Sequence, residues 1–184
     1  YYLYCRSGRW SSWLENPLRS RARVKMRKIK LTKGKFAIVD DSDFRWLNRW
    51  RWQVNTKGYA IHIHYIRMIN GKQENKTISM HRIILNAPKN KQVDHINHNI
   101  LDNRRNNLRL CTSSQNSMNR KPLSLTGLKG IYKKSKNRWG AEINTGDTRI
   151  FLGSFISPID AANAYEKASR KLFGEFAYQG GALC

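Results

Sequence analysis

Asp94 and His95 stand side by side in a stretch that reads VDHINHNILDNRRNNLRL from Val93 to Leu110. Carboxylate oxygens suit a hard divalent cation such as Mg²⁺ or Mn²⁺, which keeps water and phosphate in its remaining coordination positions. A neutral imidazole, with an ordinary pKa near ~6.5, can accept a proton from water at physiological pH. Together the two groups could bind a metal ion and activate a water molecule.

The chain around this pair is expected to form a strand, a long loop and a second strand. Val93 leads a strand into Asp94, and the residues from Ile96 to Asn107 are too polar and too rich in turn formers for a regular element. Asparagine side chains can hydrogen-bond backbone groups in place of a sheet ladder, so we expect a loop of specified shape. Leu108 and Leu110 alternate with a polar residue, which predicts that a strand returns.

A short helix should follow the second strand and carry Asn116, because Thr112 and the two serines after it are good N-cap residues. The unit is therefore strand, loop, strand and helix. Its segments DHIN, NNLRL and SSQN, with MHRIIL upstream, resemble the HNH endonucleases, or ββα-metal nucleases, over residues 79–120. The resemblance is strongest to the homing type of this family.

The resemblance implies roles for individual residues. Asp94 and Asn116 would be ligands of a divalent metal, Mg²⁺ or Mn²⁺, and His95 would be the general base. Asn107 would hold the loop through hydrogen bonds to the backbone. The basic candidates for substrate contacts are His81, His98, Arg104, Arg105 and Arg109. The role of His81 is open between packing and substrate contact. His98 departs from the family, whose members commonly have a glycine or a small turn residue there, and a plain solvent-facing histidine is the alternative.

A small antiparallel sheet is expected upstream of this unit. Residues 26–40 alternate polar and apolar side chains on both sides of Lys33-Gly34, which predicts a hairpin. Aspartates at 41 and 43 offer caps for a short helical turn. Residues 58–68 and 76–80 predict two more strands, joined around Asn70-Gly71, a favoured tight-turn pair.

The C-terminal part predicts a three-stranded sheet with one helix on its back. Residues 130–134, 138–144 and 148–155 alternate as strands, and an apolar stripe at helical spacing runs from Ala161 to Phe173. RWGAEI, RIFLGSF and AANAY resemble the AP2/ERF DNA-binding domain over residues 128–177. In that family the exposed face of the sheet lies in the major groove of DNA.

By position, the residues of that DNA-reading face would be Tyr132, Lys134, Arg138, Trp139, Glu142, Arg149 and Phe151. The sequence departs from the family at Tyr132, where arginine is usual, and at Phe151, where tryptophan is usual. The base preference of the family therefore does not carry over to this chain.

Composition points to a polyanionic partner. The 184 residues include 35 lysines and arginines against 12 acidic residues, a formal net charge of +23. With the motifs above, double-stranded DNA is the expected partner. The 3 cysteines show no CxxC pair, which supports neither a disulfide framework nor a zinc site. No apolar run approaches the ~20 residues of a membrane span, and no secretory leader is evident, so we expect an intracellular protein, cytoplasmic or nucleoid-associated.

These patterns predict an α+β chain: a small antiparallel sheet with a ββα-metal HNH unit, then an AP2-like three-stranded antiparallel sheet packed on one helix. The expected divisions are a basic extension at 1–25, the sheet and HNH unit at 26–120, a linker at 121–127, the AP2-like module at 128–177 and a tail at 178–184. The extension could be non-native or an arm that orders on DNA.

The predicted function is a homing-type DNA endonuclease that uses one divalent metal and a histidine base. With one motif per chain, a monomer or weak dimer would nick DNA or cut both strands slowly, and no protein partner is evident. The alternative is a non-catalytic, sequence-specific DNA-binding regulator built from the same modules. The presence of Asp94, His95 and Asn116 counts against that alternative. An RNA-binding protein fits the charge but not these three residues.

Overall fold

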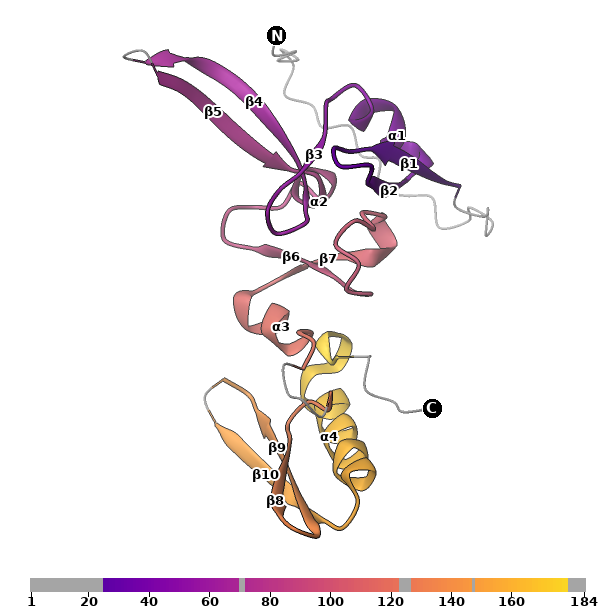
Figure 1. Ribbon diagram of the computed structural model, residues 1–184, viewed down its shortest axis with the longest axis vertical. Coiled ribbons are helices and arrows are strands. Elements are labelled where there is room, and N and C mark those ends of the chain that lie inside the picture. Colours follow the sequence, from indigo (N-terminus) through magenta and orange to yellow (C-terminus); the bar gives the residue numbers. More distant parts are fainter. Residues whose placement is uncertain (1–24, 70–71, 123–126, 147, 179–184) are drawn as a thin grey trace, which may run out of the picture.

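The computed structural model describes residues 25–69, 72–122, 127–146 and 148–178. The expected extension before residue 25 and the expected turn at Asn70-Gly71 lie outside these ranges. Figure 1 shows an elongated molecule, with the N-terminal sheets at one end and the C-terminal module at the other. All sheets are small and antiparallel, and helices accompany them, so the predicted α+β class is confirmed.

The N-terminal part has two sheets and two short helices. Its elements in chain order are β1 (Met26–Lys30), β2 (Phe36–Asp40), α1 (Asp41–Leu47), β3 (Gln53–Val54), β4 (Ala60–Ile69), β5 (Lys72–Ser79) and α2 (Met80–Ile84). The strands β1 and β2 pair around the predicted turn at Lys33-Gly34. The ribbon of β4 and β5 projects away from the body of the molecule (Figure 1).

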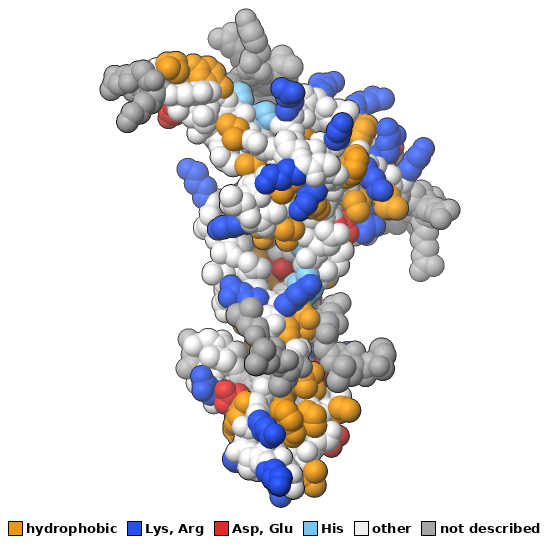
Figure 2. All heavy atoms as spheres, in the orientation of Figure 1, with side chains coloured by type: hydrophobic (Ala, Val, Ile, Leu, Met, Phe, Trp, Pro, Cys, Tyr) orange, Lys and Arg blue, Asp and Glu red, His pale blue; other side chains and the backbone are white. Residues whose placement is uncertain are grey.

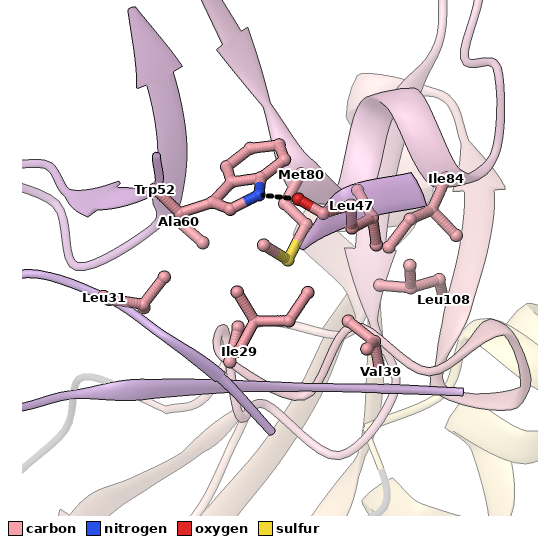
Figure 3. Packing of buried hydrophobic residues seen from close by; sticks show 10 residues of the cluster. Ile29, Leu31, Val39, Leu47, Trp52, Ala60, Met80, Ile84 and Leu108 are labelled. Atoms are coloured by element: carbon pink, nitrogen blue, oxygen red, sulfur yellow. Dashed lines mark hydrogen bonds between the residues drawn. The ribbon is translucent and has the colours of Figure 1, made fainter. Parts of the chain in front are cut away.

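One hydrophobic core ties this part to the central unit (Figure 3). Ile29, Leu47 and Met80 are at most 2% exposed, and Leu108 of the central unit packs among them. Burying such side chains contributes about 1.5–3 kcal/mol each. The indole N–H of Trp52 donates to the Leu47 carbonyl at 2.8 Å, which satisfies the polar end of a buried ring. The strand that leaves the long loop is thus anchored in the N-terminal core.

The central unit has the predicted order of strand, loop, strand and helix. Its elements are β6 (Gln92–His95), the short helix η1 (Arg105–Asn107), β7 (Leu108–Cys111) and α3 (Ser113–Met118). The strands β6 and β7 pair antiparallel, with Asp94 opposite Arg109. Thr112 caps α3 as predicted, because its hydroxyl accepts from the Gln115 N–H while the Gln115 side chain accepts from the Thr112 N–H.

The C-terminal module has three strands and one long helix, as predicted. Its elements are β8 (Ile131–Ser135), β9 (Arg138–Asn144), β10 (Arg149–Phe155), α4 (Pro158–Phe173) and the short helix η2 (Gly174–Phe176). The middle strand of the sheet is β9, and α4 covers one face of it through Ala161 and Tyr165 (Figure 1). Gly130 has φ +70°, and a Cβ there would lie 2.3 Å from the Tyr165 ring, so the turn into β8 requires glycine.

The C-terminal module contacts the central unit directly. Lys129 donates from Nζ to the Met118 carbonyl at 2.5 Å and to the Arg120 carbonyl at 3.0 Å, at the end of α3. A cation at a helix C-terminus pairs with carbonyls that have no partner within the helix. Burial lowers the pKa of Lys129 to about 8. Within the described ranges, no helix is long and apolar enough to cross a membrane.

Candidate active site

A hollow of about 400 Å³ opens between β6, the loop that follows it and the helix α3. It brings together three residues predicted from different parts of the motif, Asp94, His95 and Asn116. The remaining lining includes both polar and apolar residues. The polar ones include His98, Asn119, Arg120 and Lys121. Figure 2 shows lysine and arginine side chains distributed over both halves of the molecule on this face, with few acidic ones.

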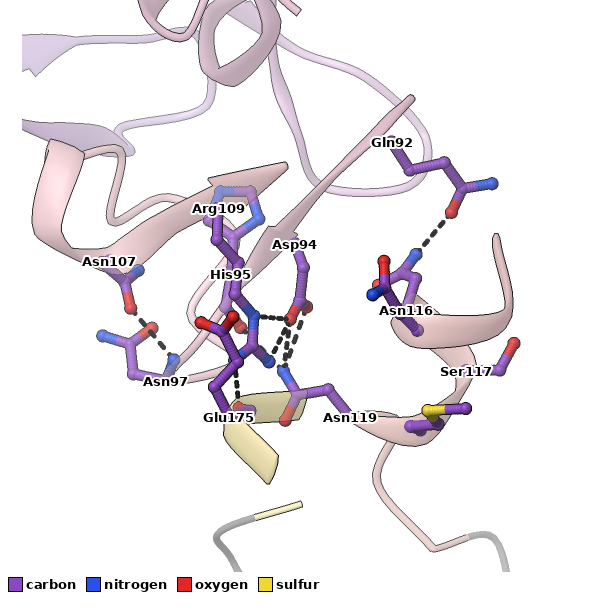
Figure 4. A network of polar contacts seen from close by, with 12 residues as sticks. Gln92, Asp94, His95, Asn97, Asn107, Arg109, Asn116, Ser117, Asn119 and Glu175 are labelled. Atoms are coloured by element: carbon purple, nitrogen blue, oxygen red, sulfur yellow. Dashed lines mark hydrogen bonds and ion pairs between the residues drawn. The ribbon is translucent and has the colours of Figure 1, made fainter. Parts of the chain in front are cut away.

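Asp94 is a buried carboxylate with a dense set of partners (Figure 4). Arg109 donates to its Oδ2 from Nε at 2.9 Å and from Nη2 at 2.6 Å. The Asn119 amide donates to both carboxylate oxygens, at 3.0 and 2.9 Å. These contacts fix the carboxylate in the wall of the hollow.

The oxygen atoms of this wall fit a hard cation. Oδ1 of Asp94 accepts a single hydrogen bond in the described structure, from Asn119, so it keeps lone-pair capacity. The amide of Asn116 donates to Gln92 Oε1 at 2.7 Å, which leaves its own Oδ1 without a donor among the described residues. Across those same residues there is no cluster of three His, Cys, Asp or Glu side chains. Carboxylate and amide oxygens together with water are the ligands that Mg²⁺ and Mn²⁺ accept.

His95 is 5% exposed and its Nε2 lies 3.4 Å from Oδ1 of Asn103. The Asn103 amide nitrogen donates to the Leu101 carbonyl, so its oxygen faces the imidazole as an acceptor. Nε2 must then carry the proton, and Nδ1 is the nitrogen that can accept one. Burial lowers the pKa of His95 below its ordinary value, against the raising effects of Asn103, Asp94 and Asp102. The imidazole is therefore neutral at physiological pH.

His81 lies behind His95 rather than in the hollow. The two rings are 5.3 Å apart in an edge-on arrangement, and Tyr59 packs against both of them. Nδ1 of His81 is buried and has no hydrogen-bond partner among the described residues. Burial is the largest of the causes that lower the pKa of His81 to about 3. His81 therefore packs the general-base candidate in place as a neutral ring.

His98 adopts φ +61°, a left-handed conformation that a glycine would adopt without strain. The sequence therefore places a histidine in a backbone conformation that favours glycine. The His98 ring packs on Tyr178, at 5.2 Å, beyond the end of the C-terminal module. Its Nε2 is buried without a partner in the described ranges.

The asparagines of the long loop bind its backbone. Oδ1 of Asn107 accepts from the Asn97 N–H at 3.0 Å, and the Asn107 amide donates to the Asp102 carbonyl at 2.8 Å. The Asn97 amide donates to Asp102 Oδ2 at 2.9 Å. These bonds close the loop on itself across ten residues of sequence separation. The side chain of His95 is therefore presented by a loop with a fixed shape.

Two of the arginines considered for substrate contacts are occupied by carboxylates. Arg104 forms a two-pronged pair with Asp102, at 2.8 and 2.7 Å. Arg105 forms another with Asp43, a residue of α1, at 2.8 Å for both bonds. Such pairs fix geometry. The first pair lies within the loop, and the second joins the loop to the N-terminal part.

Arg109 differs from these two because it bridges the hollow and the C-terminal module. Besides its bonds to Asp94, it donates from Nη1 to the Glu175 carbonyl (Figure 4). Its guanidinium also lies 4.4 Å from the centre of the Phe176 ring. The side chain is 11% exposed. The available cations at the hollow are instead Arg120 and Lys121, which form no ion pair with any described residue.

The outer face of the C-terminal sheet exposes several of the residues expected to read DNA. Tyr132 and Phe151 are 39% and 55% exposed, and Lys134 lies over the Phe151 ring at 5.2 Å. Arg138 is exposed, whereas Arg149 pairs with Glu142 at 3.5 Å. Trp139 is partly buried and packs against the core under α4. A Cβ at position 140 would lie 2.5 Å from the Tyr132 ring, so glycine lets this ring lie flat on the sheet.

Sequence reasoning missed two residues of the site. Asn119 lies three positions after Asn116, so helical spacing places both on the side of α3 that faces Asp94. That spacing was the available signal. Asn103 is fully buried beside His95, but nothing in the run of loop asparagines distinguishes it from its neighbours.

The chain is similar to known nucleases. The sequence model of the HNH endonuclease family matches residues 86–118. An uncharacterized HNH endonuclease of Acanthamoeba polyphaga mimivirus is 30% identical over 151 residues, which are 79% of this chain and 74% of that protein. The chain belongs to the HNH endonuclease family. It is a DNA-hydrolysing enzyme of a class that generally uses a divalent metal.

The C-terminal part is similar to plant transcription factors. An AP2/ERF and B3 domain-containing transcription factor of Arabidopsis thaliana is 45% identical over 47 residues, which are 26% of this chain and 13% of that protein. A dehydration-responsive element-binding protein of Oryza sativa subsp. japonica is 38% identical over 52 residues, 27% of this chain and 16% of that protein. The predicted combination of an HNH unit with an AP2/ERF-like module is therefore confirmed.

Proposed function

We propose that the chain is a homing-type endonuclease that hydrolyses phosphodiester bonds of double-stranded DNA with one divalent metal and a histidine general base. The observation that carries this proposal is the hollow in which His95, Asp94 and Asn116 meet beside the unpaired cations Arg120 and Lys121. The homing type is proposed because a second, AP2/ERF-like module on the same chain would lengthen the recognised site.

Asp94 and Asn116 would hold the metal through side-chain oxygens, and Mg²⁺ or Mn²⁺ fits this donor set best. When bound, the cation would supply Lewis-acid stabilisation of the charge that builds on the phosphate and on the leaving oxygen. Arg120 and Lys121 would bind the phosphates on either side and orient the strand. Asn119 would fix the Asp94 carboxylate, since it donates to both oxygens.

His95 would take the proton of the attacking water at Nδ1. Asn103 would keep the required tautomer because its Oδ1 accepts a hydrogen bond from the Nε2–H of His95. The lowered pKa of His95, caused mainly by burial, keeps the base neutral before the reaction. The neighbouring carboxylates of Asp94 and Asp102 would stabilise the imidazolium that forms.

The test is relaxation of supercoiled plasmid by the purified chain. We expect nicked product with Mg²⁺ or Mn²⁺ and none with EDTA, with 5′-phosphate and 3′-hydroxyl ends. His95→Ala should lower the nicking rate by at least about a hundredfold, the size of a lost general base. Asn116→Ala should also lower the rate, because it removes an oxygen ligand of the metal. Asn106→Ala, an exposed asparagine outside the hollow, is the matched control and should nick at the wild-type rate.

Binding of DNA without metal separates chemistry from affinity in the same experiment. His95→Ala should bind the plasmid as tightly as the wild type, because the imidazole contributes to proton transfer rather than to charge. The assigned site would be refuted if wild-type protein binds DNA but fails to nick it with every divalent cation tried. One motif per chain predicts that a monomer nicks, so linear product that appears only at high protein concentration would indicate a dimer.

A further inference from the structure

Most arginines of the described chain already have partners. Seven form ion pairs with carboxylates, and Arg82 donates to three backbone carbonyls. The arginines of the described ranges that show neither an ion pair nor a side-chain hydrogen bond are Arg45, Arg49, Arg51, Arg120 and Arg138. Arg120 belongs to the active-site hollow and Arg138 to the AP2/ERF-like sheet. Arg49 and Arg51 are exposed and belong to neither.

Arg49 and Arg51 stand at a groove of about 650 Å³, larger than the active-site hollow. The groove lies between the chain that follows α1 and the start of the strand β4, and its walls include Trp50, Trp52, His62 and Ile63. Cavities of roughly 300–1,000 Å³ are the usual size for a site that takes one small organic group. Aromatic floor and unpaired guanidinium groups thus meet in one place outside the nuclease site.

The rings of the groove are held by the core. The buried Trp52 is fixed by its bond to the Leu47 carbonyl (Figure 3). Trp50 is half-buried and lies 5.6 Å from the Trp52 ring in a stacked arrangement, and 5.0 Å from His62. The indole N–H of Trp50 has no acceptor among the described residues. It is a free donor in the wall of the groove.

His62 supplies the complementary group. Its Nδ1 lies 2.9 Å from the Arg51 carbonyl, which can only accept, so Nδ1 carries the proton. Nε2 is therefore left as an acceptor. The groove offers a stacked aromatic surface, one free N–H donor, one acceptor and two cations. This set matches a nucleotide, whose base has a π-face with donors and acceptors on its edge, and whose flanking phosphates are anionic.

We propose that this groove binds an unpaired nucleotide of a DNA strand, with the base against Trp50 and its flanking phosphates on Arg49 and Arg51. The proposal rests on DNA being the substrate of the hollow, as proposed above. A paired base is already stacked inside the duplex and its rings cannot contact a protein groove. A backbone contact alone would use the two arginines and leave the aromatic floor without a role.

The test is equilibrium binding of the full chain, in EDTA, to three labelled ligands: a short single strand, a blunt duplex, and the same duplex with an unpaired tail. Arg49→Ala/Arg51→Ala should weaken binding to the single strand and the tailed duplex by at least about tenfold, the scale of two lost phosphate contacts. The same double variant should weaken binding to the blunt duplex no more than Lys167→Ala/Lys171→Ala does. That control removes the same charge from the exposed side of α4.

A second measurement reads the ring directly. A 5-iodouridine placed in the unpaired tail should crosslink to the peptide that contains Trp50, and Trp50→Leu should abolish this crosslink while circular dichroism stays unchanged. Because the two arginines are exposed, their double variant remains informative even if Trp50→Leu fails to fold.

Three results would overturn the proposal. If the arginine double variant loses equal affinity for the blunt and the tailed duplex, the groove contacts the duplex backbone. If its loss of affinity for the single strand and the tailed duplex is no larger than that of the lysine control, the groove is not a binding site. Tighter, groove-dependent binding of an RNA strand of the same sequence would assign the groove to RNA. All of these are binding results in EDTA, so they are distinct from a failure to nick plasmid with Mg²⁺, which concerns His95 and the hollow.

Discussion

Replacing Arg109 with methionine should destabilise the folded protein by breaking a buried ion pair. The two side chains, Arg109 and Asp94, are 11% and 7% exposed. Removal of one member of such a pair costs about 3–5 kcal/mol, because the other charge is left in a medium of low polarity. We expect about 3 kcal/mol, the lower end of that range, since Asn119 still donates to both oxygens of Asp94.

The double-mutant cycle makes the reasoning specific. Asp94→Asn should cost about 2 kcal/mol, because it leaves Arg109 with the Glu175 carbonyl and the Phe176 ring. The double variant carries two neutral side chains of similar size, so it should lose about 2 kcal/mol rather than the sum of about 5. The assay is urea unfolding followed by circular dichroism.

The matched control is Arg67→Met, which makes the same change in a pair with Glu74 whose side chains are 67% and 43% exposed. Screening by water keeps such pairs weak, so the free energy of unfolding should change by less than about 0.5 kcal/mol. Strict additivity in the cycle would refute the view that Arg109 and Asp94 stabilise the fold as a unit. So would an Arg109→Met variant as stable as the control.

Two further predictions concern the histidines of the site. The pKa of His81 is lowered to about 3, whereas an unfolded histidine titrates near ~6.5. Between these values the unfolded chain binds the additional proton, so stability should fall as the pH falls below ~6.5, by about 2 kcal/mol at pH ~5 from this residue. His81→Gln should flatten the dependence of the urea midpoint on pH, and parallel curves would contradict the assignment. Asn103→Ala should slow single-turnover cleavage by at least about tenfold with unchanged DNA affinity, because the imidazole of His95 loses its fixed orientation. A variant that changes only the DNA affinity would contradict this positioning role.

The elements around the site were predictable because each has a local cause in the sequence. Lys33-Gly34 sets a hairpin, Thr112 begins a helix, and Leu108 alternates with its neighbours on a half-buried strand. The resemblance to the HNH family assigned Asp94, His95 and Asn116 to one site, and all three line one hollow. Local pattern was sufficient wherever partners lie close in sequence.

The partners of charged side chains were not predictable in the same way. Asp43 pairs with Arg105 across 62 positions, and a sequence shows only that both are charged. An arginine in a basic chain is equally compatible with a phosphate contact and with a buried carboxylate. The outcome depends on which acidic residue the fold brings near, so tertiary structure decides it. For the same reason, composition alone could not single out Arg49 and Arg51 as free.

Three contacts of the C-terminal part of the chain have a consequence for chimeric enzymes. They join Lys129 to the end of α3, Arg109 to the Glu175 carbonyl, and His98 to Tyr178. A foreign recognition module spliced on after Arg120 would replace Lys129, Glu175 and Tyr178 together. The helix that carries Asn116 and Asn119 would then lose the cation at its end, and Arg109 would lose its outer partner. We therefore expect retargeting of this nuclease to succeed through new residues on the outer face of the C-terminal sheet, with the junction side of that module left intact.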